Sequence, residues 1–493
     1  MDSVYIEVGP VWARLRGPSA QLTYVREAFT VDVPGAEYTP QARYRAWDGK
    51  TRFVKQGDVI LSGLVWRCAG YLMKGGFPKP DVLWSATPQK PPLVEKSVDV
   101  RAYQEPVIQK MQRVRRMGVQ MPTGAGKTLT AIEAARRIGE RTLWLTHTKE
   151  LLAQTVSTFE NSLGIKCGIL GSGKEIEGDG RVVVATIQTL TRMLRAAPDV
   201  VKPWLSDFGC VIADEGHHAS ADSWQEIFNA CTGAHYRFAL SATLDTGNEV
   251  NNLKIEGVTG PTWIVESVAS LAGLGWLAKP RVVMLSVSPK SYPSYEQIRD
   301  IVCPTWEDNP RQLRSLGGKL FSETYERGIV NNKDRNAKIV EVIRRHVQVA
   351  DKMLVLVSRI PHMMSLVDTV RSEGLSVMGL DGGATDAART EAFNLFKAGL
   401  RGRALIATPF AREGIDLPQI DVGMLAGGGL SDVVVMQGFG RMLRKRRDKD
   451  EVLIYDFVDG GAPSDREDKD YLAEHSKSRL GLYVNQGFTV ERE

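Results

Sequence analysis

The sequence predicts an α/β protein in which two parallel-sheet domains follow one another, preceded by a small β-rich or α+β module. From about residue 100, apolar strands alternate with amphipathic helices, a pattern typical of a parallel sheet covered by helices. A polar, helix-rich stretch interrupts this series, and a second series of strands and helices follows it. Before residue 94 the apolar residues alternate over short runs that end at turn signals such as Asp48-Gly49, which indicates a different kind of fold.

The length and composition are those of a multidomain globular protein. At 493 residues the chain exceeds what one hydrophobic core supports, so we expect roughly three domains. It is 43% apolar and 25% charged, and no apolar run approaches the roughly 18 residues that a membrane span requires. The start of the chain carries acidic residues where an export signal would be basic and apolar, so a cytoplasmic location is expected. The five scattered cysteines predict free thiols and no zinc site.

The first module is predicted to span residues 1–93. Alternating apolar residues indicate short strands within residues 4–15 and 43–65, and the proline-rich residues 79–94 indicate a linker. The net charge of the chain is +5, and residues 1–93 hold twelve Lys and Arg against eight Asp and Glu. Most of the small positive excess therefore lies in this module.

Two α/β domains are predicted after the linker, at residues 94–275 and 346–462. A helical connecting region is expected between them at residues 276–345, and a helical tail at residues 463–493. The strands expected in the first domain are residues 118–121, 142–146, 182–186, 210–214 and 237–241. Those expected in the second are residues 353–358, 376–380, 403–408, 422–426 and 452–457.

A glycine-rich loop connects the first of these strands to an Ala-rich helix. Gly124 to Thr128 fit the short pattern GxGKT, and backbone N–H groups at such a strand-to-helix turn converge on phosphate groups. Lys127 would contact the β- and γ-phosphates, and Thr128 would bind Mg²⁺. A glycine turn that precedes a lysine by chance is the alternative. The predicted nucleotide-binding loop consists of Pro122, Thr123, Gly124, Ala125, Gly126, Lys127 and Thr128.

Two adjacent carboxylates follow a later apolar strand. Asp214 and Glu215 come directly after Val211 to Ala213, and the carboxyl ends of parallel strands are where α/β proteins bind ligands. Asp214 can hold Mg²⁺ through water, and Glu215 can orient and deprotonate an attacking water. Surface charges on a loop are the alternative. Together with the glycine-rich loop, the pair predicts ATP hydrolysis with ATP and Mg²⁺ as cofactors.

These two motifs, followed by Ser241-Ala242-Thr243 after the next strand, resemble those of superfamily 2 helicases, in the DExH-box branch. The resemblance covers about residues 100–460, with the motifs in the expected order. It implies two tandem RecA-like domains that close on ATP and move along nucleic acid. By resemblance, Arg101 and Gln104 belong to the adenine-reading element, Gly414 and Asp416 to the nucleotide site, and His217, Ser241 and Thr243 to a coupling element.

The resemblance also implies contacts with the nucleic-acid backbone and a set of groups supplied by the second domain. The implied backbone contacts are Thr148, Lys149, Thr186, Ser358, Arg359 and Thr408. Gln437, Arg441 and Arg444 fit the motif QxxGRxxR and would act in catalysis with Lys127 and Glu215. Arginines brought across a cleft neutralise charge that develops on the γ-phosphate. Without the resemblance, residues 441–447 are simply a basic run, on a solvated face or in a phosphate-binding patch.

The first module contains a segment in which basic and aromatic residues are interleaved. Such a segment is suited to phosphate contact and base stacking, and the candidate contacts are Arg43, Arg45, Trp47, Lys50 and Arg52. A hairpin with its aromatic residues packed inward and its charges outward is the alternative. We therefore predict a DNA-binding accessory domain and leave this alternative open.

Within the superfamily, the small first module, the DExH box and residues 331–345 resemble the recombination DNA helicases of T-even phages, and more distantly a class of repair helicases. This implies an ATP-dependent DNA helicase that remodels forked or branched DNA by branch migration or fork regression. A monomer is expected, in the host cytoplasm if a phage encodes the chain. The alternatives are an RNA helicase, the motor subunit of a restriction enzyme, and a non-catalytic DNA-binding scaffold. The scaffold is disfavoured because Lys127, Asp214, Glu215 and Arg444 are all present.

Overall fold

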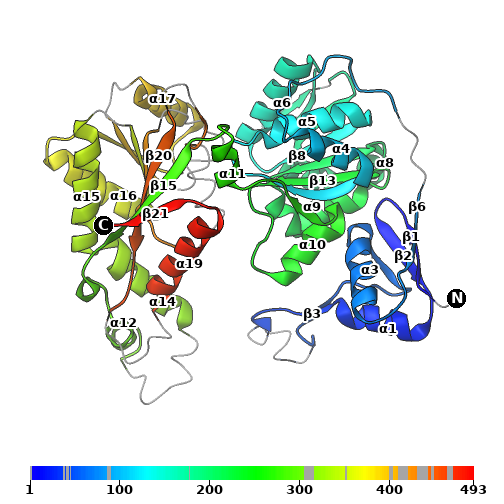
Figure 1. The fold of residues 1–493 in the computed structure, drawn as a ribbon, viewed down its shortest axis with the longest axis horizontal. Coiled ribbons are helices and arrows are strands. Elements are labelled where there is room, and N and C mark those ends of the chain that lie inside the picture. Colours follow the sequence, from blue (N-terminus) through cyan, green and yellow to red (C-terminus); the bar gives the residue numbers. More distant parts are fainter. Residues whose placement is uncertain are drawn as a thin grey trace. The chain divides into compact units, whose positions relative to one another are not determined.

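The computed structural model describes residues 3–36, 39, 44, 46–85, 90–171, 173–176, 178–304, 316–349, 352–398, 403–408, 420–429, 442–445, 449–462 and 470–493. The chain forms two compact units (Figure 1). The first consists of Met1–Met121 and Gly126–Val265, and the second of Glu266–Glu493 together with the short segment Pro122–Ala125. No helix in the described part of the chain is long and apolar enough to cross a bilayer.

The N-terminal module is an α+β fold. Its elements are β1 (Tyr5–Val8), β2 (Trp12–Arg16), α1 (Ser19–Ala28), β3 (Thr30–Asp32), β4 (Lys50–Arg52), β5 (Val59–Leu61), the 3-10 turn η2 (Ser62–Leu64), α3 (Val65–Lys74) and β6 (Asp81–Trp84). The main sheet has the order β5-β2-β1-β6, and β3 pairs with β4 separately. The linker predicted at residues 79–94 is wrong for residues 81–84, because β6 pairs in parallel with β1 and completes the sheet.

The module shares one hydrophobic core with the first α/β sheet. The turn η2 packs directly on helix α10 (Glu249–Thr259), and a Cβ on Gly63 would lie 1.9 Å from the carbonyl oxygen of Glu256. The carboxylate of Glu256 also accepts a hydrogen bond from Nε of Arg67 at 2.8 Å. The module is therefore packed on the sheet rather than tethered to it.

A buried arginine of the first α/β sheet also holds the N-terminal module against that sheet. Arg116 is the first residue of the strand that leads into the glycine-rich loop, and its guanidinium donates to Oγ of Ser62 at 2.7 Å and to the carbonyl oxygen of Pro10 at 2.5 Å. Burial, together with the nearby charges of Arg237 and Arg115, keeps the pKa of Arg116 well below its ordinary value. These neutral acceptors serve both terminal nitrogens of Arg116, while its buried Nε has no hydrogen-bond partner among the described residues.

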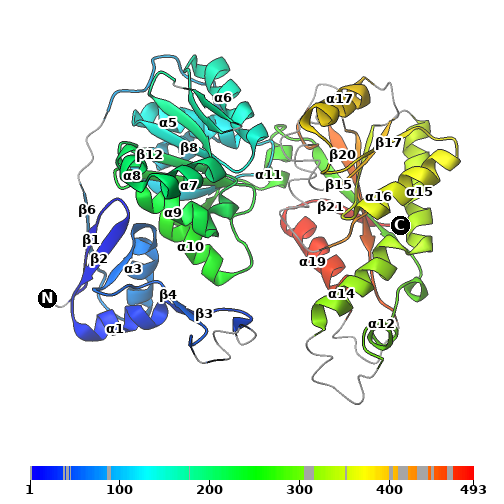
Figure 2. The same cartoon turned by 180° about the vertical axis from the view of Figure 1, so that it is seen from behind.

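The first α/β domain surrounds an eight-stranded sheet. Its elements are α4 (Glu105–Val114), β7 (Arg116–Gln120), α5 (Lys127–Ile138), β8 (Thr142–Thr146), α6 (Lys149–Leu163), β9 (Gly168–Gly171), β10 (Lys174–Ile176), β11 (Val182–Thr186), α7 (Ile187–Ala196), α8 (Pro198–Ser206), β12 (Cys210–Asp214), η3 (Gly216–Ser220), α9 (Asp222–Ala230), β13 (Tyr236–Ser241), α10 and β14 (Thr262–Ile264). The strand order is β10-β9-β11-β8-β12-β13-β7-β14. Every pairing is parallel except that of β10 with β9. Helices α5 and α6 lie on one face of this sheet, and α9 and α10 on the other (Figures 1 and 2).

The second unit surrounds a seven-stranded parallel sheet with the order β17-β18-β16-β19-β20-β15-β21. Its elements are α11 (Val268–Gly273), β15 (Lys279–Ser286), η4 (Pro289–Ser291), α12 (Tyr295–Val302), α14 (Gly317–Tyr325), the π-helical turn η5 (Glu326–Val330), α15 (Lys333–Gln348), β16 (Met353–Leu356), α16 (Ile360–Ser372), β17 (Val377–Leu380), α17 (Asp386–Lys397), β18 (Ala404–Ala407), β19 (Val422–Leu425), β20 (Glu451–Val458), α19 (Tyr471–Asn485) and β21 (Thr489–Arg492).

The five strands predicted in each α/β series are confirmed: they are β7, β8, β11, β12 and β13 in the first sheet and β16 to β20 in the second. Two expectations of purely helical segments are wrong. Residues 279–286, in the supposed helical connecting region, form β15 between β20 and β21. Residues 489–492, in the supposed helical tail, form β21, so the sheet draws strands from both regions.

A buried network of charges lies at one end of the second sheet. Nε of Arg479 is 2.9 Å from Oδ2 of Asp456, and its Nη2 is 3.1 Å from Oδ2 of Asp459. Asp459 also accepts from Nε of Arg335 at 2.8 Å, and all four side chains are at most 2% exposed. The two arginines also donate to backbone carbonyl groups of the turn after β19, at Ala426 and Gly429. The network thereby holds that turn against α15 and α19.

Candidate nucleotide and nucleic-acid site

The glycine-rich loop runs from the end of β7 to the start of α5. Gly124 and Gly126 have φ values of 86° and 82°, in the left-handed region that favours glycine. Gly126 is the N-cap of α5, which begins at Lys127. A Cβ on Gly126 would lie 2.6 Å from Nε2 of Gln104, so the position is closed to a side chain for a second reason. The N-terminus of α5 has no side-chain cap, so its backbone N–H groups can bind an anion, as in phosphate-binding turns.

Gln104 is a buried residue that contacts this loop. The side chain is 2% exposed, its Oε1 accepts from the backbone N–H of Arg101 at 2.7 Å, and its Nε2 donates to the carbonyl oxygen of Gly126 at 3.3 Å. Arg101 in turn donates from Nη1 to the hydroxyl of Tyr103 at 3.0 Å. The structure thus gives Gln104 a direct contact with the loop, and places Arg101 against Gln104.

The loop has three polar side chains, those of Thr123, Lys127 and Thr128. Nζ of Lys127 donates to the carbonyl oxygen of Met121 at 3.4 Å, the long end of the hydrogen-bond range, and is therefore weakly held. Thr128 is half-buried in the first turn of α5. The hydroxyl of Thr123 is buried and has no hydrogen-bond partner among the described residues. A buried hydroxyl without a partner is costly, which favours a polar ligand at this position.

Asp214 and Glu215 lie at the carboxyl end of β12. Asp214 is 5% exposed, and its Oδ1 accepts from the backbone N–H of Glu215 at 3.0 Å. Burial, followed by repulsion from Glu215, raises the pKa of Asp214 to about 6, although Lys127 opposes the shift. A carboxylate that is costly to ionise alone is suited to a cation. Glu215 has φ 50° and ψ 53°, a left-handed conformation that is strained for a non-glycine residue and is found most often at functional sites.

The next residue explains how this strained turn is held. A Cβ on Gly216 would lie 2.5 Å from Cβ and 3.0 Å from Cα of Ala239, in the neighbouring strand β13. Gly216 therefore packs on the strand itself, and His218 donates its backbone N–H to the carbonyl oxygen of Glu215 at 3.1 Å. Only glycine permits this close approach of turn and strand.

We expect Gly216→Ala to lower the kcat of ATP hydrolysis at least tenfold. The added methyl group overlaps Ala239, so the turn must move, and displacement of a reacting group by about 1 Å can cost roughly 100-fold in rate. Steady-state ATPase assays would measure the change. Gly70→Ala in α3 is the matched control, because an added Cβ there meets nothing within 4 Å. An unchanged kcat in Gly216→Ala would show that the position of the turn does not matter.

We expect Asp214→Asn to stabilise the ligand-free protein at pH 8 while it abolishes ATP hydrolysis. Because the folded-state pKa lies above the unfolded one, the stability that protonated Asp214 contributes is complete below about pH 4 and is lost as the pH rises through about 6. The asparagine removes this loss, up to roughly 3 kcal/mol for a shift of about two units. Urea denaturation in EDTA at pH 5 and pH 8 would measure it. The exposed Asp222→Asn is the control, and equal pH dependence in Asp214→Asn and wild type would contradict the prediction.

The predicted coupling residues contact one another. Nδ1 of His217 lies 3.0 Å from Oγ of Ser241 and 3.5 Å from Oε2 of Glu215. Oγ of Ser241 donates to the carbonyl oxygen of Thr243 at 2.8 Å and accepts from its backbone N–H at 3.2 Å. Two further histidines were missed by the sequence analysis: the ring of His218 lies against that of His217, and the ring of His147 lies against that of His218. Only the doubled histidine at residues 217–218 could have drawn attention to them.

The predicted backbone contacts of the first unit lie at helix starts. Thr148 is the N-cap of α6 and accepts from the backbone N–H of Leu151 at 3.2 Å, while Lys149 is exposed. Thr186 precedes α7 but is 5% exposed, and its hydroxyl donates to Oγ1 of Thr189 at 2.9 Å. Lys149 is therefore accessible to phosphate, whereas the Thr148 hydroxyl already caps α6 and the Thr186 hydroxyl already has a partner.

In the second unit, Ser358 and Arg359 are exposed after β16, and the guanidinium of Arg359 lies 5.7 Å from the ring centroid of Tyr325. Thr408 is 4% exposed, and its hydroxyl has no hydrogen-bond partner among the described residues. Arg444 is half-buried. The predicted residues Gly414, Asp416, Gln437 and Arg441 lie outside the described residues.

The interleaved segment of the N-terminal module is only partly described, and Arg43 and Arg45 lie outside that part. The indole N–H of Trp47 donates to the carbonyl oxygen of Lys50 at 2.9 Å, so this ring closes a turn. Lys50 and Arg52 form exposed ion pairs with Asp32 and Asp48, and such pairs contribute little stability. They can therefore exchange their carboxylate partners for phosphate. Tyr44 is 84% exposed, and its ring is available for stacking.

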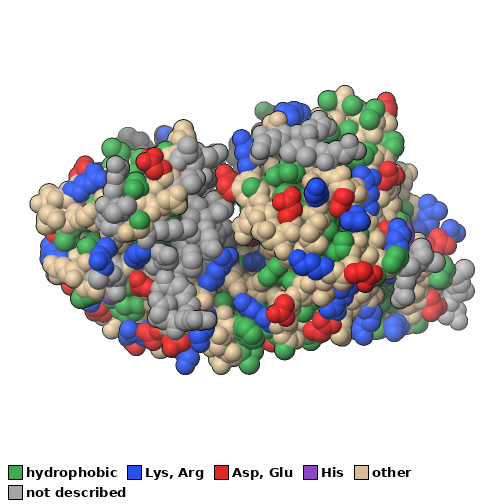
Figure 3. Space-filling view, turned by 90° about the horizontal axis from the view of Figure 1, so that it is seen from above, with side chains coloured by type: hydrophobic (Ala, Val, Ile, Leu, Met, Phe, Trp, Pro, Cys, Tyr) green, Lys and Arg blue, Asp and Glu red, His purple; other side chains and the backbone are tan. Residues whose placement is uncertain are grey.

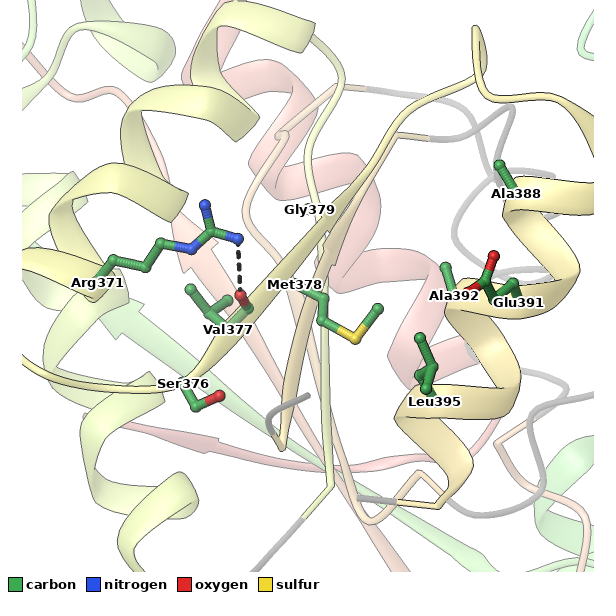
Figure 4. A pocket seen from close by; sticks show the side chains of 9 residues that line it. All are labelled: Arg371, Ser376, Val377, Met378, Gly379, Ala388, Glu391, Ala392 and Leu395. Atoms are coloured by element: carbon green, nitrogen blue, oxygen red, sulfur yellow. Dashed lines mark hydrogen bonds between the residues drawn. The ribbon is translucent and has the colours of Figure 1, made fainter. Parts of the chain in front are cut away.

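Other surface features of the residues that the structure describes do not point to a second site. On the face in Figure 3, Lys and Arg side chains are interspersed with Asp and Glu. A cavity of about 660 Å³ lies between β17 and α17, where Arg371 donates to the carbonyl oxygen of Val377 at 3.3 Å (Figure 4). None of its lining residues is a predicted site residue. The described residues include no cluster of His, Cys, Asp and Glu that could hold a metal ion by itself.

Comparison with known proteins places these motifs in a family. Residues 97–246 match the family described as the res subunit of type III restriction enzymes, and residues 334–446 match the helicase conserved C-terminal domain. The chain is a superfamily 2 helicase. The two matched regions of the helicase contain the glycine-rich loop, the Asp214-Glu215 pair and Arg444, as the motif order predicted.

Relatives of the helicase include two DNA-acting proteins. The chain is 22% identical to the ATP-dependent DNA helicase uvsW of Enterobacteria phage T4, over 94% of this chain and 93% of the relative. It is 23% identical to the DNA 3'-5' translocase XPB2 of Sulfurisphaera tokodaii, over 74% of this chain and 82% of the relative. Among solved structures, the helicase domain of Pyrococcus furiosus Hef covers 77% of this chain, with 98% of its own length matched, a TM-score of 0.50 and 17% identity. That likeness confirms the tandem RecA-like fold.

Proposed function

We propose that this helicase hydrolyses ATP to move along DNA and remodels forked or branched DNA, in recombination, replication or repair. The observation that carries the proposal is the near full-length similarity to the phage T4 DNA helicase, which includes the N-terminal module as well as the two motor domains. A similarity confined to the motor would support nucleic-acid translocation but would say nothing of the substrate.

The residues at the ends of β7 and β12 would perform hydrolysis. The amides of the glycine-rich loop and Lys127 bind the phosphates, and Glu215 orients the attacking water and accepts its proton. Thr128 and Asp214 would hold Mg²⁺, which supplies charge neutralisation on the phosphates when bound. The buried position of Asp214 fits this assignment. We further propose that Arg444, with Gln437 and Arg441, contributes to hydrolysis, and that Gly414 and Asp416 belong to the nucleotide site.

Nucleic acid would bind through the helix starts and exposed basic residues of both units. The proposed contacts are Thr148, Lys149, Thr186, Ser358, Arg359 and Thr408, with Arg43, Arg45, Trp47, Lys50 and Arg52 from the N-terminal module. These groups hydrogen-bond or neutralise phosphates, which positions a strand without reading its sequence. The N-terminal module would add a DNA-binding surface outside the two motor domains, which suits a branched substrate.

The test compares substrates in one assay series. ATP hydrolysis and strand displacement are measured with a DNA fork, a four-way DNA junction, a linear DNA duplex and an RNA fork of matched sequence. We expect the branched DNAs to stimulate hydrolysis most and to be remodelled, with Glu215→Gln inactive throughout. Stimulation by the RNA fork alone would favour an RNA helicase, and equal action on linear and branched DNA would remove the branched-DNA role.

The contribution of the N-terminal module is tested by point variants, because its core is continuous with that of the first sheet and a truncation would expose it. We expect the double variant Lys50→Ala and Arg52→Ala to weaken fork binding several-fold and to reduce its salt dependence by up to about two phosphate contacts. Arg16→Ala, at another exposed ion pair of the module, is the matched control. Unchanged fork affinity and salt dependence in the double variant would contradict the DNA contact.

A further inference from the structure

Three histidine rings in the first unit touch one another in turn in tilted contacts, and we call this group the histidine stack. The ring centroids of His147 and His218 are 4.4 Å apart, with an interplanar angle of 46°, and those of His218 and His217 are 4.1 Å apart, with an angle of 41°. His147 comes from the connection between β8 and α6, whereas the other two belong to η3, directly after the carboxyl end of β12. The stack therefore joins two connections at the same edge of the sheet.

One end of the stack lies among the residues proposed to contact nucleic acid. His147 directly precedes Thr148, the N-cap of α6, and its carbonyl oxygen accepts a hydrogen bond from Nε2 of Gln188 at 2.9 Å. Gln188 lies in the first turn of α7, two residues after Thr186. If nucleic acid binds and moves the start of α6 or of α7, His147 would therefore move as well.

The other end of the stack lies at the carboxylate proposed to activate water. His217 is within 3.0 Å of Oγ of Ser241 and 3.5 Å of Oε2 of Glu215. Glu215 has a strained left-handed backbone, and such a conformation persists only when its surroundings impose it. The carbonyl oxygen of Glu215 also accepts from the backbone N–H of His218. The position of His218 therefore bears on Glu215 directly through its backbone N–H, and indirectly through the ring of His217.

We propose that His147 and His218 are positioning residues that couple occupancy of the nucleic-acid-contacting helix starts to the placement of Glu215. This rests on the proposed function, since it requires hydrolysis that nucleic acid stimulates. Packed rings transmit displacement because neither can move without the other. Each ring acts by packing against its neighbour. A phenylalanine ring at position 218 should therefore preserve the coupling, whereas the methyl group of alanine should not.

The experiment measures the ratio of stimulated to basal kcat in wild type, His147→Ala, His218→Ala and His218→Phe, with whichever nucleic acid stimulates the wild type most. We expect the two alanine variants to lower this ratio by roughly 2- to 30-fold, the range seen when coupling positions are changed. The KM for ATP and the affinity for nucleic acid should stay within about twofold, and His218→Phe should keep most of the wild-type ratio.

His235→Ala is the matched control, because His235 is half-buried just before β13 and therefore at the opposite end of the sheet. It should leave the ratio unchanged. An unchanged ratio in His218→Ala, equal losses of basal and stimulated rates, or a ratio in His218→Phe as low as in His218→Ala would each overturn the proposal. A wild type that RNA stimulates but DNA does not would refute the proposed DNA function while still testing the stack, and a wild type that neither stimulates would refute both.

Discussion

Glu215→Gln is expected to lower the kcat of ATP hydrolysis by a factor of about 100 to 10,000, while ATP still binds. Loss of a general base costs roughly this much, because the amide cannot accept the proton of the attacking water. The two side chains have nearly the same shape, so the strained turn between β12 and η3 should keep its place. Steady-state hydrolysis with and without DNA, and equilibrium binding of a fluorescent ATP analogue, measure the two halves of the prediction.

Glu226→Gln is a suitable control, since Glu226 lies in α9 and forms an exposed ion pair with Arg195. It should keep the wild-type kcat within about twofold, as surface pairs contribute little. Hydrolysis by Glu215→Gln at the wild-type rate would remove Glu215 from the mechanism. A loss of both binding and hydrolysis would indicate that the substitution disturbs the turn instead.

Arg479→Met is expected to destabilise the chain by about 3 to 5 kcal/mol. The substitution leaves Asp456 and Asp459 buried without one of their cations, and an unpaired buried charge is far more costly than a missing surface pair. It also removes the donor to the carbonyl oxygen of Gly429. Urea denaturation followed by circular dichroism would measure the change in the transition that reports the second unit.

The same substitution at an exposed pair provides the comparison. Arg344 in α15 pairs with Glu373 at the surface, and Arg344→Met should cost less than about 1 kcal/mol. Equal destabilisation by the two variants would show that burial does not set the strength of the Arg479 network. A stable Arg479→Met variant would show that water reaches the two carboxylates.

Sequence reasoning located strands best where they are central and apolar. β8, β11 and β12 are buried along their whole length and were predicted to the residue. β21 was missed because it is a short, largely exposed edge strand, Thr489–Arg492, without an apolar pattern. β15 begins with Lys279-Pro280-Arg281 and pairs with β20, about 170 residues later, a partnership that no local pattern reveals.

In the candidate site, too, local motifs could be predicted from the sequence and contacts between separate elements could not. The loop at Lys127 and the pair Asp214-Glu215 could be predicted because each depends on residues adjacent in the sequence. Three contacts could not be predicted, since each joins separate elements: the hydrogen bond from Gln104 to Gly126, the approach of Gly216 to Ala239, and the ring contact of His218 with His147. Such contacts are set by how the strands are ordered in the sheet.

The packing of the N-terminal module on α10 has a consequence for synthesis of the chain. Turn η2 leaves the ribosome well before Glu249–Thr259, the helix that covers it. At roughly 5 to 20 residues per second, the intervening stretch takes on the order of 10 to 40 seconds to make. During that time the face of the module around Leu61 and Leu64 has no partner. The first unit therefore completes its core only after α10 has been made, and a nascent chain stalled before residue 249 leaves this apolar face uncovered.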